Sequence, residues 1–144
     1  MMKTLLSLLA LALLLPIAAE AEQAQKFDDV EIHYNALSTN DLTPEIAKSY
    51  KLTRSKSHGL LTISVLKKNS MGASYPVAAE IKVNVVNIYS QLTNIGMREI
   101  REGGAIYYLG EYWVVAPETL KFNISVKPEG SAQPYSYEYP QSFY

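Results

Sequence analysis

The sequence predicts an all-β protein: an antiparallel β-sandwich, immunoglobulin-like, with about seven strands and one short helix near residues 44–50. Three observations predict this fold class. Apolar and polar residues alternate with a period of two in several separate segments, as they do in strands with one buried face. Turn-forming residues recur between these segments at near-regular spacing, and no strand–helix–strand alternation occurs. The chain is also rich in the strand formers Val, Ile and Tyr, with 11 tyrosines.

The first two expected elements are a strand and a helix. Segment 27–37 alternates apolar and polar residues, which predicts a strand with one solvated face. Segment 44–50 is predicted to be a short helix, because Thr43 is a good N-cap and Pro44 suits the first helical position. The polar residues 22–26 are expected to form a loose segment before the first strand.

Six further segments show strand-like patterns: 59–67, 77–89, 93–102, 105–115, 119–126 and 135–144. Gly103 and Gly104 predict a two-residue hairpin turn, because both can adopt positive φ. A two-residue turn places Arg98 diagonal to Glu111 on one face, within reach of an ion pair, and it places Glu99 beside Tyr108 on the other face. The aromatic last segment also raises an outer-membrane barrel as a rival fold. Its tyrosines are out of phase with the C-terminal residue, and fewer than eight spans are clear, which disfavours the barrel.

The N-terminus predicts a secretory signal peptide over residues 1–21. A short positive start precedes a Leu- and Ala-rich run, and Ala19 and Ala21 form an A-x-A cleavage site. An uncleaved anchor is the alternative, but the run is broken by Pro16 before it reaches the roughly 20 apolar residues that a membrane span needs. The expected mature protein is a single β-sandwich domain over 22–144, exported to the periplasm and without a stable membrane anchor; secretion beyond the periplasm stays open.

Composition excludes several function classes. Lys and Arg number 13 against 14 Asp and Glu, and this net charge of -1 gives no electrostatic case for nucleic acid as a partner. The absence of cysteine excludes disulfides, thiol catalysis and Cys-ligated metals. The two histidines, His33 and His58, have no motif around them, so both are expected to be ordinary surface residues. We therefore expect no catalytic residues, no metal and no cofactor.

The charged hairpin is the candidate binding surface. Its expected members carry alternating charges and aromatic rings beside the Gly-Gly turn: Arg98, Glu99, Arg101, Tyr107, Glu111 and Trp113. One interpretation is a polar recognition patch framed by Tyr and Trp. The competing interpretation is a cross-strand ion pair beside ordinary core aromatics, an arrangement that is common in sheets.

Several stretches resemble a known family. They are LTPEIA at 42–47, GLLTISVL at 59–66, REIRE at 98–102 and AIYY at 105–108, followed by the Phe-Tyr ending. In this order, and with the predicted signal peptide, they resemble small exported proteins of Gram-negative bacteria that are labelled domain of unknown function 4426. The resemblance implies a periplasmic β-rich domain and supplies no catalytic residues.

Three hypotheses for function follow. The first is a non-catalytic periplasmic domain that binds an unknown protein or cell-envelope component, since sandwich proteins commonly bind through edge strands and end loops. The second is a glycan- or peptidoglycan-binding module that uses exposed aromatics such as Tyr107, Tyr112 and Trp113. The third is a small hydrolase that uses His33 or His58.

Overall fold

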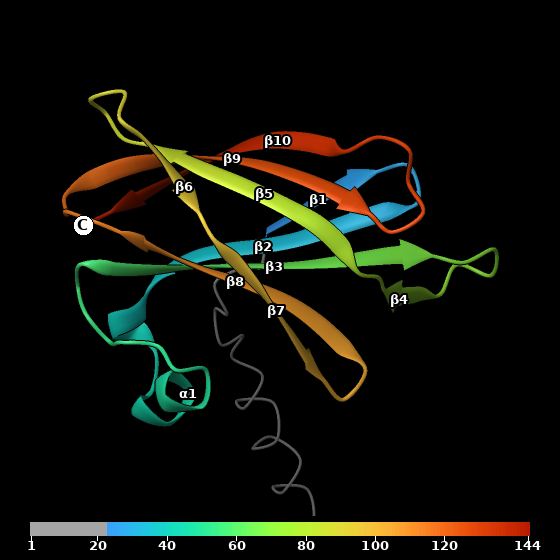
Figure 1. Cartoon of the computed structure of the whole chain (residues 1–144), viewed down its shortest axis with the longest axis horizontal. Helices are drawn as coiled ribbons and strands as arrows, with labels where there is room; N and C mark the ends of the chain where they lie inside the picture. Colours follow the sequence, from blue (N-terminus) through green and yellow to red (C-terminus); the bar gives the residue numbers. More distant parts are fainter. Residues whose placement is uncertain (1–22) are drawn as a thin grey trace, which may run out of the picture.

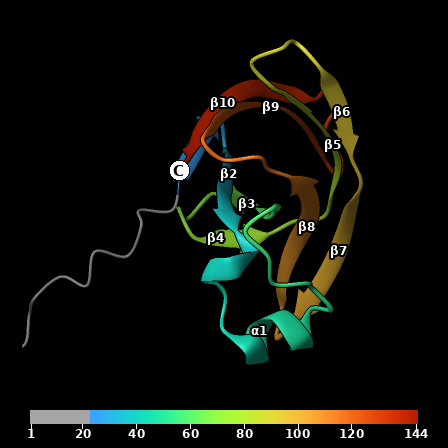
Figure 2. The same cartoon turned by 90° about the vertical axis from the view of Figure 1, so that its left-hand side faces the viewer.

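Two antiparallel β-sheets pack face to face in the structure, a computed structural model that describes residues 23–144 (Figures 1 and 2). The predicted antiparallel β-sandwich with one short helix is confirmed. The expected signal peptide and its cleavage residues Ala19 and Ala21 lie outside the described residues. In residues 23–144, no helix is long and apolar enough to cross a membrane.

The first sheet, sheet A, has the strand order β1-β2-β3-β8-β7, and β4 pairs with β3. Its strands are β1 (Gln23–Phe27), β2 (Val30–Ser38), β3 (His58–Lys68), β4 (Ser74–Pro76), β7 (Met97–Glu102) and β8 (Ala105–Trp113). The second sheet, sheet B, has the order β10-β9-β5-β6. Its strands are β5 (Ala79–Val86), β6 (Leu92–Ile95), β9 (Glu118–Pro128) and β10 (Tyr135–Phe143).

The core lies between the sheets, where the predicted alternation places the apolar faces of the strands. The least exposed large side chains come from both sheets: Val30, Ile32, Leu61, Ile63, Val65, Phe122, Ile124 and Val126. Complete burial of a side chain of this size stabilises a fold by roughly 1.5–3 kcal/mol. The cysteine-free sandwich is therefore held by its core.

The described chain has ten strands, whereas the sequence predicts about seven. Residues 22–26 were expected to be loose, but β1 pairs with β2 along its whole length. Its residues are mostly exposed, so the segment has no apolar pattern to reveal it. The short β4 escapes prediction because it has three exposed residues and ends at Pro76.

The predicted strand 93–102 is two strands, because the chain changes sheets at Gly96. β6 pairs with β5 in sheet B, and β7 pairs with β8 in sheet A. Because Gly110 of β8 has no side chain, residues 95–97 can pass close to β8 where they cross between the sheets. A Cβ at position 110 would be 2.3 Å from Met97 Sδ and 2.6 Å from Ile95 Cγ2. The β7–β8 turn is as predicted, with Gly103 and Gly104 at φ 54° and 85°.

The helix α1 (Pro44–Ser49) lies beyond sheet A, on the side away from sheet B (Figure 2). Thr43 caps it as predicted, with its hydroxyl accepting a 3.2 Å hydrogen bond from the Ile46 N–H. A 3-10 turn, η1 (Thr39–Asp41), leads into the helix. Thr39 is fully buried, and its hydroxyl lies within hydrogen-bond distance of the Ser55 and His58 carbonyls, which ties this segment to the start of β3.

Candidate functional site

A groove opens between α1 and the outer face of sheet A. We call it the sheet A groove; it has a volume of about 280 Å³ and a mostly apolar lining. The residues that line it come from β2, α1 and its flanks, β3, β7 and β8: His33, Leu37, Leu42, Ile46, Tyr50, Leu60, Thr62, Ile63, Ser64, Ile100, Glu102, Tyr107 and Leu109.

A small second core fixes the helix over the sheet. Ala47 and Leu52 pack against Leu60 of β3 and Leu109 of β8, and all four are at most 8% exposed. Leu109 has the outward parity of β8 but is buried, because the helix segment covers the outer face of the strand at this position. The second core does not fill the space beneath the helix, and the remainder is the groove.

Two polar contacts tie the end of the helix to the edge strand β7. The Tyr50 hydroxyl donates a 3.0 Å hydrogen bond to Glu102 Oε2, and this bond raises the pKa of the phenol above its usual value of 10.0. The Arg98 guanidinium donates to the backbone carbonyl of Tyr50. These contacts hold one wall of the groove. They join residues about fifty positions apart, so the sequence carries no local signal for them.

Beyond Tyr107 the groove continues into a second hollow near the β7–β8 turn, with a volume of about 480 Å³. His33, Ser64 and Tyr107 line both hollows. His33 is held by Glu31, with 2.8 Å between Nε2 and Oε1. An extended ligand can therefore lie along the outer face of sheet A, crossing β2, β3 and β8.

The six predicted binding residues are divided between two faces of the hairpin. Four of them occupy strand positions that point away from the main core: Arg98, Tyr107, Glu111 and Trp113. The other two, Glu99 and Arg101, occupy positions on the opposite face of the hairpin. This division agrees with the predicted hairpin register, which puts Arg98 and Glu99 on opposite faces, because the side-chain direction reverses at every residue of a strand. The expected ion pair of Arg98 and Glu111 is absent from the described residues, since Arg98 bonds to the Tyr50 carbonyl instead. The binding role of these residues stays a prediction.

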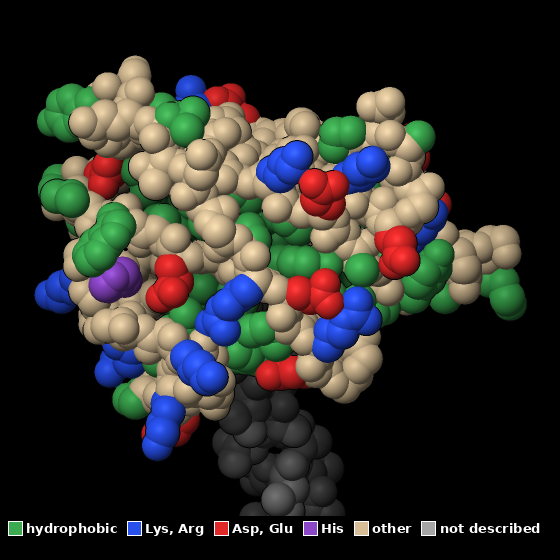
Figure 3. Space-filling view, in the orientation of Figure 1, with side chains coloured by type: hydrophobic (Ala, Val, Ile, Leu, Met, Phe, Trp, Pro, Cys, Tyr) green, Lys and Arg blue, Asp and Glu red, His purple; other side chains and the backbone are tan. Residues whose placement is uncertain are grey.

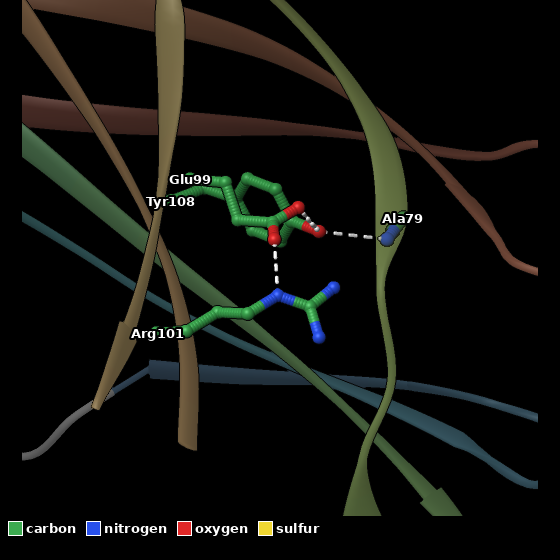
Figure 4. Close-up of polar contacts among 4 residues, drawn as sticks. All are labelled: Ala79, Glu99, Arg101 and Tyr108. Atoms are coloured by element: carbon green, nitrogen blue, oxygen red, sulfur yellow. Dashed lines mark hydrogen bonds and ion pairs between the residues drawn. The ribbon is translucent and has the colours of Figure 1, made fainter. Parts of the chain in front are cut away.

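Glu99 and Arg101 belong to a network that closes one corner of the sandwich (Figure 4). The Tyr108 hydroxyl donates to Glu99 Oε2 at 3.2 Å and accepts a 2.8 Å hydrogen bond from the Ala79 N–H at the start of β5. Arg101 Nε donates to Glu99 Oε1 at 2.5 Å. The predicted contact of Glu99 with Tyr108 is confirmed.

This network links sheet A to sheet B, so its first role is structural. Hydrogen bonding to Arg101 lowers the pKa of the Glu99 carboxyl. Burial raises the pKa of the Tyr108 phenol, so the phenol stays protonated and donates to the carboxylate. Both partners of the Glu99 carboxylate lie within the protein, which leaves this carboxylate committed to the fold.

The aromatic residues near the end of β8 differ in exposure. Trp113 is 69% exposed and packs against His58, with 4.1 Å between ring centroids and the ring planes tilted by 37°. Tyr112, proposed from the sequence as part of an aromatic platform, is 4% exposed and lies in the main core, so that part of the prediction is wrong. Tyr107 is 41% exposed and lies in the groove wall.

The face of the molecule seen in Figure 3 carries no large patch of one charge sign that would indicate a charged partner. Figure 3 shows basic and acidic side chains interspersed over this face, with apolar side chains between them. Opposite charges also pair along single strands, as Lys82 does with Glu80 at 3.5 Å. This agrees with the near-zero net charge.

The fold and groove define a β-sandwich protein whose helix leaves an apolar groove on one sheet. The chain belongs to the family described as Domain of unknown function (DUF4426), whose model matches residues 24–144. The resemblance seen in the sequence is thereby confirmed. A comparison with curated proteins finds no match.

Solved structures share the fold. A DUF4426 family protein from Pseudomonas aeruginosa PAO1 is 27% identical, with a TM-score of 0.73, covering 88% of this chain and 97% of its own. FetP of uropathogenic E. coli strain F11, expressed recombinantly in the periplasm of E. coli, is 13% identical, with a TM-score of 0.60, covering 85% of this chain and 93% of its own. A copper-bound variant of FetP matches equally well, at 13% identity and a TM-score of 0.60, covering 85% of this chain and 95% of its own.

Proposed function

We propose that this chain is an exported, non-catalytic binding module of the periplasm, and that the sheet A groove receives apolar side chains of a partner protein in the cell envelope. The predicted signal peptide supports export. The observation that carries the binding role is the apolar groove itself. It is held open by the Tyr50 contacts to β7, and its rim carries Ile46 and Tyr107, which are 45% and 41% exposed.

The groove suits a protein segment better than a small polar ligand. Grooves between a helix and a sheet take the side chains of an extended segment, while the segment's backbone stays near the polar rim. Here Leu42, Leu60 and Ile100 line the space. The Glu102 carboxylate and the Thr62 hydroxyl stand beside them as polar groups for a ligand backbone.

Catalysis is disfavoured by the same geometry. Glu31 holds His33, and Ser64 is the cross-strand partner of His33, which is the nearest approach to a hydrolase triad among the described residues. Such chemistry also needs hydrogen-bond donors, from the backbone or from side chains, aimed at a developing oxyanion. β2 and β3 are interior strands of sheet A, and β2 pairs with β3 along its whole length, which commits much of this backbone to the sheet.

A copper site like that implied by the copper-bound FetP variant does not fit the residues present. In residues 23–144, no group of three His, Asp, Glu or Cys side chains is placed to hold a metal ion. His33 pairs with Ser64, and His58 lies six residues further back along β3, so the two imidazoles belong to distant parts of sheet A.

A glycan platform built on exposed aromatics is also disfavoured. Tyr107 and Trp113 lie six residues apart on the same strand, roughly 20 Å at the rise of a β-strand. His58 covers part of the Trp113 ring, and Tyr112 is buried. No flat surface joins these rings.

In-cell photo-crosslinking tests the binding role. A photoreactive phenylalanine analogue replaces Tyr107 in one strain and Tyr75 in a control strain, since Tyr75 is 42% exposed and lies outside the groove. We expect a discrete protein adduct in the periplasmic fraction from position 107 and none from position 75. Identical adduct patterns at the two positions, or no adduct at 107, would show that the groove binds no protein.

A further inference from the structure

A row of amide side chains crosses three of the four strands of sheet B on its outer face. Asn94 of β6 pairs with Asn84 of β5, Asn84 pairs with Asn123 of β9, and Asn123 pairs with Glu138 of β10. The neighbouring row contains Lys82, Ser125 and Ser136 in register. We call the three asparagines the amide row.

These asparagines occupy strand positions that their residue type disfavours. Asn is depleted in strands, where Thr, Lys or Glu would provide a solvated outer face at lower cost. Three in one cross-strand row, spanning three of the four strands, therefore need an explanation other than solubility. The sequence alone does not predict the row, because the three asparagines lie far apart along the chain. Only the strand register of sheet B makes them neighbours.

The amides are oriented by one hydrogen bond, in which Asn123 Nδ2 donates to Asn84 Oδ1 at 2.8 Å. The remaining atoms, Asn84 Nδ2 and Asn123 Oδ1, make no other hydrogen bond within the part of the chain that the structure describes. Asn84 thus keeps a donor group and Asn123 an acceptor oxygen for a ligand, and both side chains are only partly buried. A pair of adjacent hydroxyls on a sugar ring can satisfy both at once, because each hydroxyl donates and accepts.

The row lies in a hollow of about 570 Å³, lined also by Lys82, Ser125, Ser136 and Glu138. The charges at its rim are already paired: Lys82 with Glu80 at 3.5 Å, and Lys121 with Glu138 at 3.1 Å. The hollow therefore presents neutral hydrogen-bonding groups and little uncompensated charge. Four strands span roughly 14 Å, which allows a short linear ligand to contact every strand.

We propose that the outer face of sheet B, through the amide row, binds an uncharged oligosaccharide. This surface is on the opposite side of the sandwich from the sheet A groove and uses different residues. An experiment can therefore refute the protein-binding role of the groove without refuting the glycan-binding role of sheet B, and the reverse also holds.

Titration of the ¹⁵N-labelled domain followed by NMR of side-chain amides tests the proposal. The probes are three neutral oligosaccharides, chitotetraose, maltotetraose and cellotetraose, and one anionic control, tetragalacturonate. The variants are N84T and N123T, which keep a polar strand former, and the matched control N35T on the outer face of sheet A. Two-dimensional spectra of each variant first confirm the native fold.

We expect at least one neutral oligosaccharide to shift the Asn84 and Asn123 side-chain amide signals in a saturable way. N84T and N123T should each weaken that binding at least about fivefold, the scale expected for loss of a hydrogen bond, and N35T should leave it unchanged. Absence of shifts with all three neutral probes overturns the proposal. So do equal affinity of N84T and wild type, or binding of the anionic probe alone.

Discussion

The ring of Tyr112 lies over Gly59, its cross-strand partner, in the space that a side chain at position 59 would occupy. A Cβ there would be 2.0 Å from Tyr112 Cε2. The ring can therefore cross the core, where its hydroxyl donates a 3.2 Å hydrogen bond to the Leu37 carbonyl and its edge meets Phe122 with 4.9 Å between centroids. This packing places β8, and with it Tyr107 and Leu109, against β3 beneath the groove.

Gly59→Ala is expected to destabilise the domain by about 1–3 kcal/mol, because the added methyl group forces the Tyr112 ring to move within a packed core. Chemical denaturation followed by far-ultraviolet circular dichroism measures the free energy of unfolding. Gly96→Ala is the matched control, since a Cβ at Gly96 meets nothing within 4 Å. Equal stability of G59A and G96A would contradict this role for Gly59.

Tyr108→Phe is expected to cost about 1–3 kcal/mol, because it removes two hydrogen bonds and leaves the partly buried Ala79 N–H without its acceptor. Tyr75→Phe removes the same atom at an exposed position and should change the unfolding free energy by less than about 0.5 kcal/mol. If the two substitutions have the same effect, the corner network does not stabilise the sandwich.

The domain should lose stability as pH rises above about 10, the pKa of an unperturbed tyrosine. Burial raises the pKa of Tyr108, Tyr112 and Tyr137. These phenols stay neutral in the folded state but ionise in the unfolded state, so their stabilising contribution is complete below pH 10 and is lost as pH rises toward their folded-state pKa values. Denaturation midpoints measured at a series of alkaline pH values should fall, and a midpoint independent of pH above 10 would refute the linkage.

Arg98→Ala is expected to loosen α1 without unfolding the sandwich, because Arg98 donates to the Tyr50 carbonyl at the end of the helix. Hydrogen exchange should become faster for residues 46–52 and stay slow for the core strands. Arg101→Ala removes the same charge from the same strand but on the opposite face, and exchange in 46–52 should not change. Equal exchange in this segment for both variants would show that Arg98 does not position the helix.

Much of the fold is predictable from the sequence, because strand alternation and turn residues act locally. Thr43 and Pro44 predict α1, and Gly103 and Gly104 predict the hairpin and its register. The strands that escape prediction are β1 and β4, since exposed edge segments need no apolar pattern. The change of sheet at Gly96 is not predictable from the sequence, because it shows only in the pairing of β6 with β5 and of β7 with β8.

The candidate site is less predictable from the sequence, because the contacts that form it join residues about fifty positions apart. The hairpin residues Arg98 and Tyr107 do reach the groove region, but the sequence gives no sign that Tyr50 and Glu102 meet across it. Leu109 shows the same limit: its outward parity predicts exposure, whereas the helix segment covers it. Glu99 and Arg101 lie on the opposite face of the hairpin from Arg98, as strand alternation requires, so they do not line the groove.

A groove-filling variant tests whether a partner protein enters the sheet A groove. Ser64 lines both hollows on the outer face of β3, so Ser64→Trp should fill the groove while leaving the buried faces unchanged. The measurement is the yield of the periplasmic adduct formed by the photoreactive residue at position 107, with and without this substitution, in variants shown to be folded. We predict that the yield falls to that of the Tyr75 control; an unchanged yield in a folded S64W protein would contradict the claim.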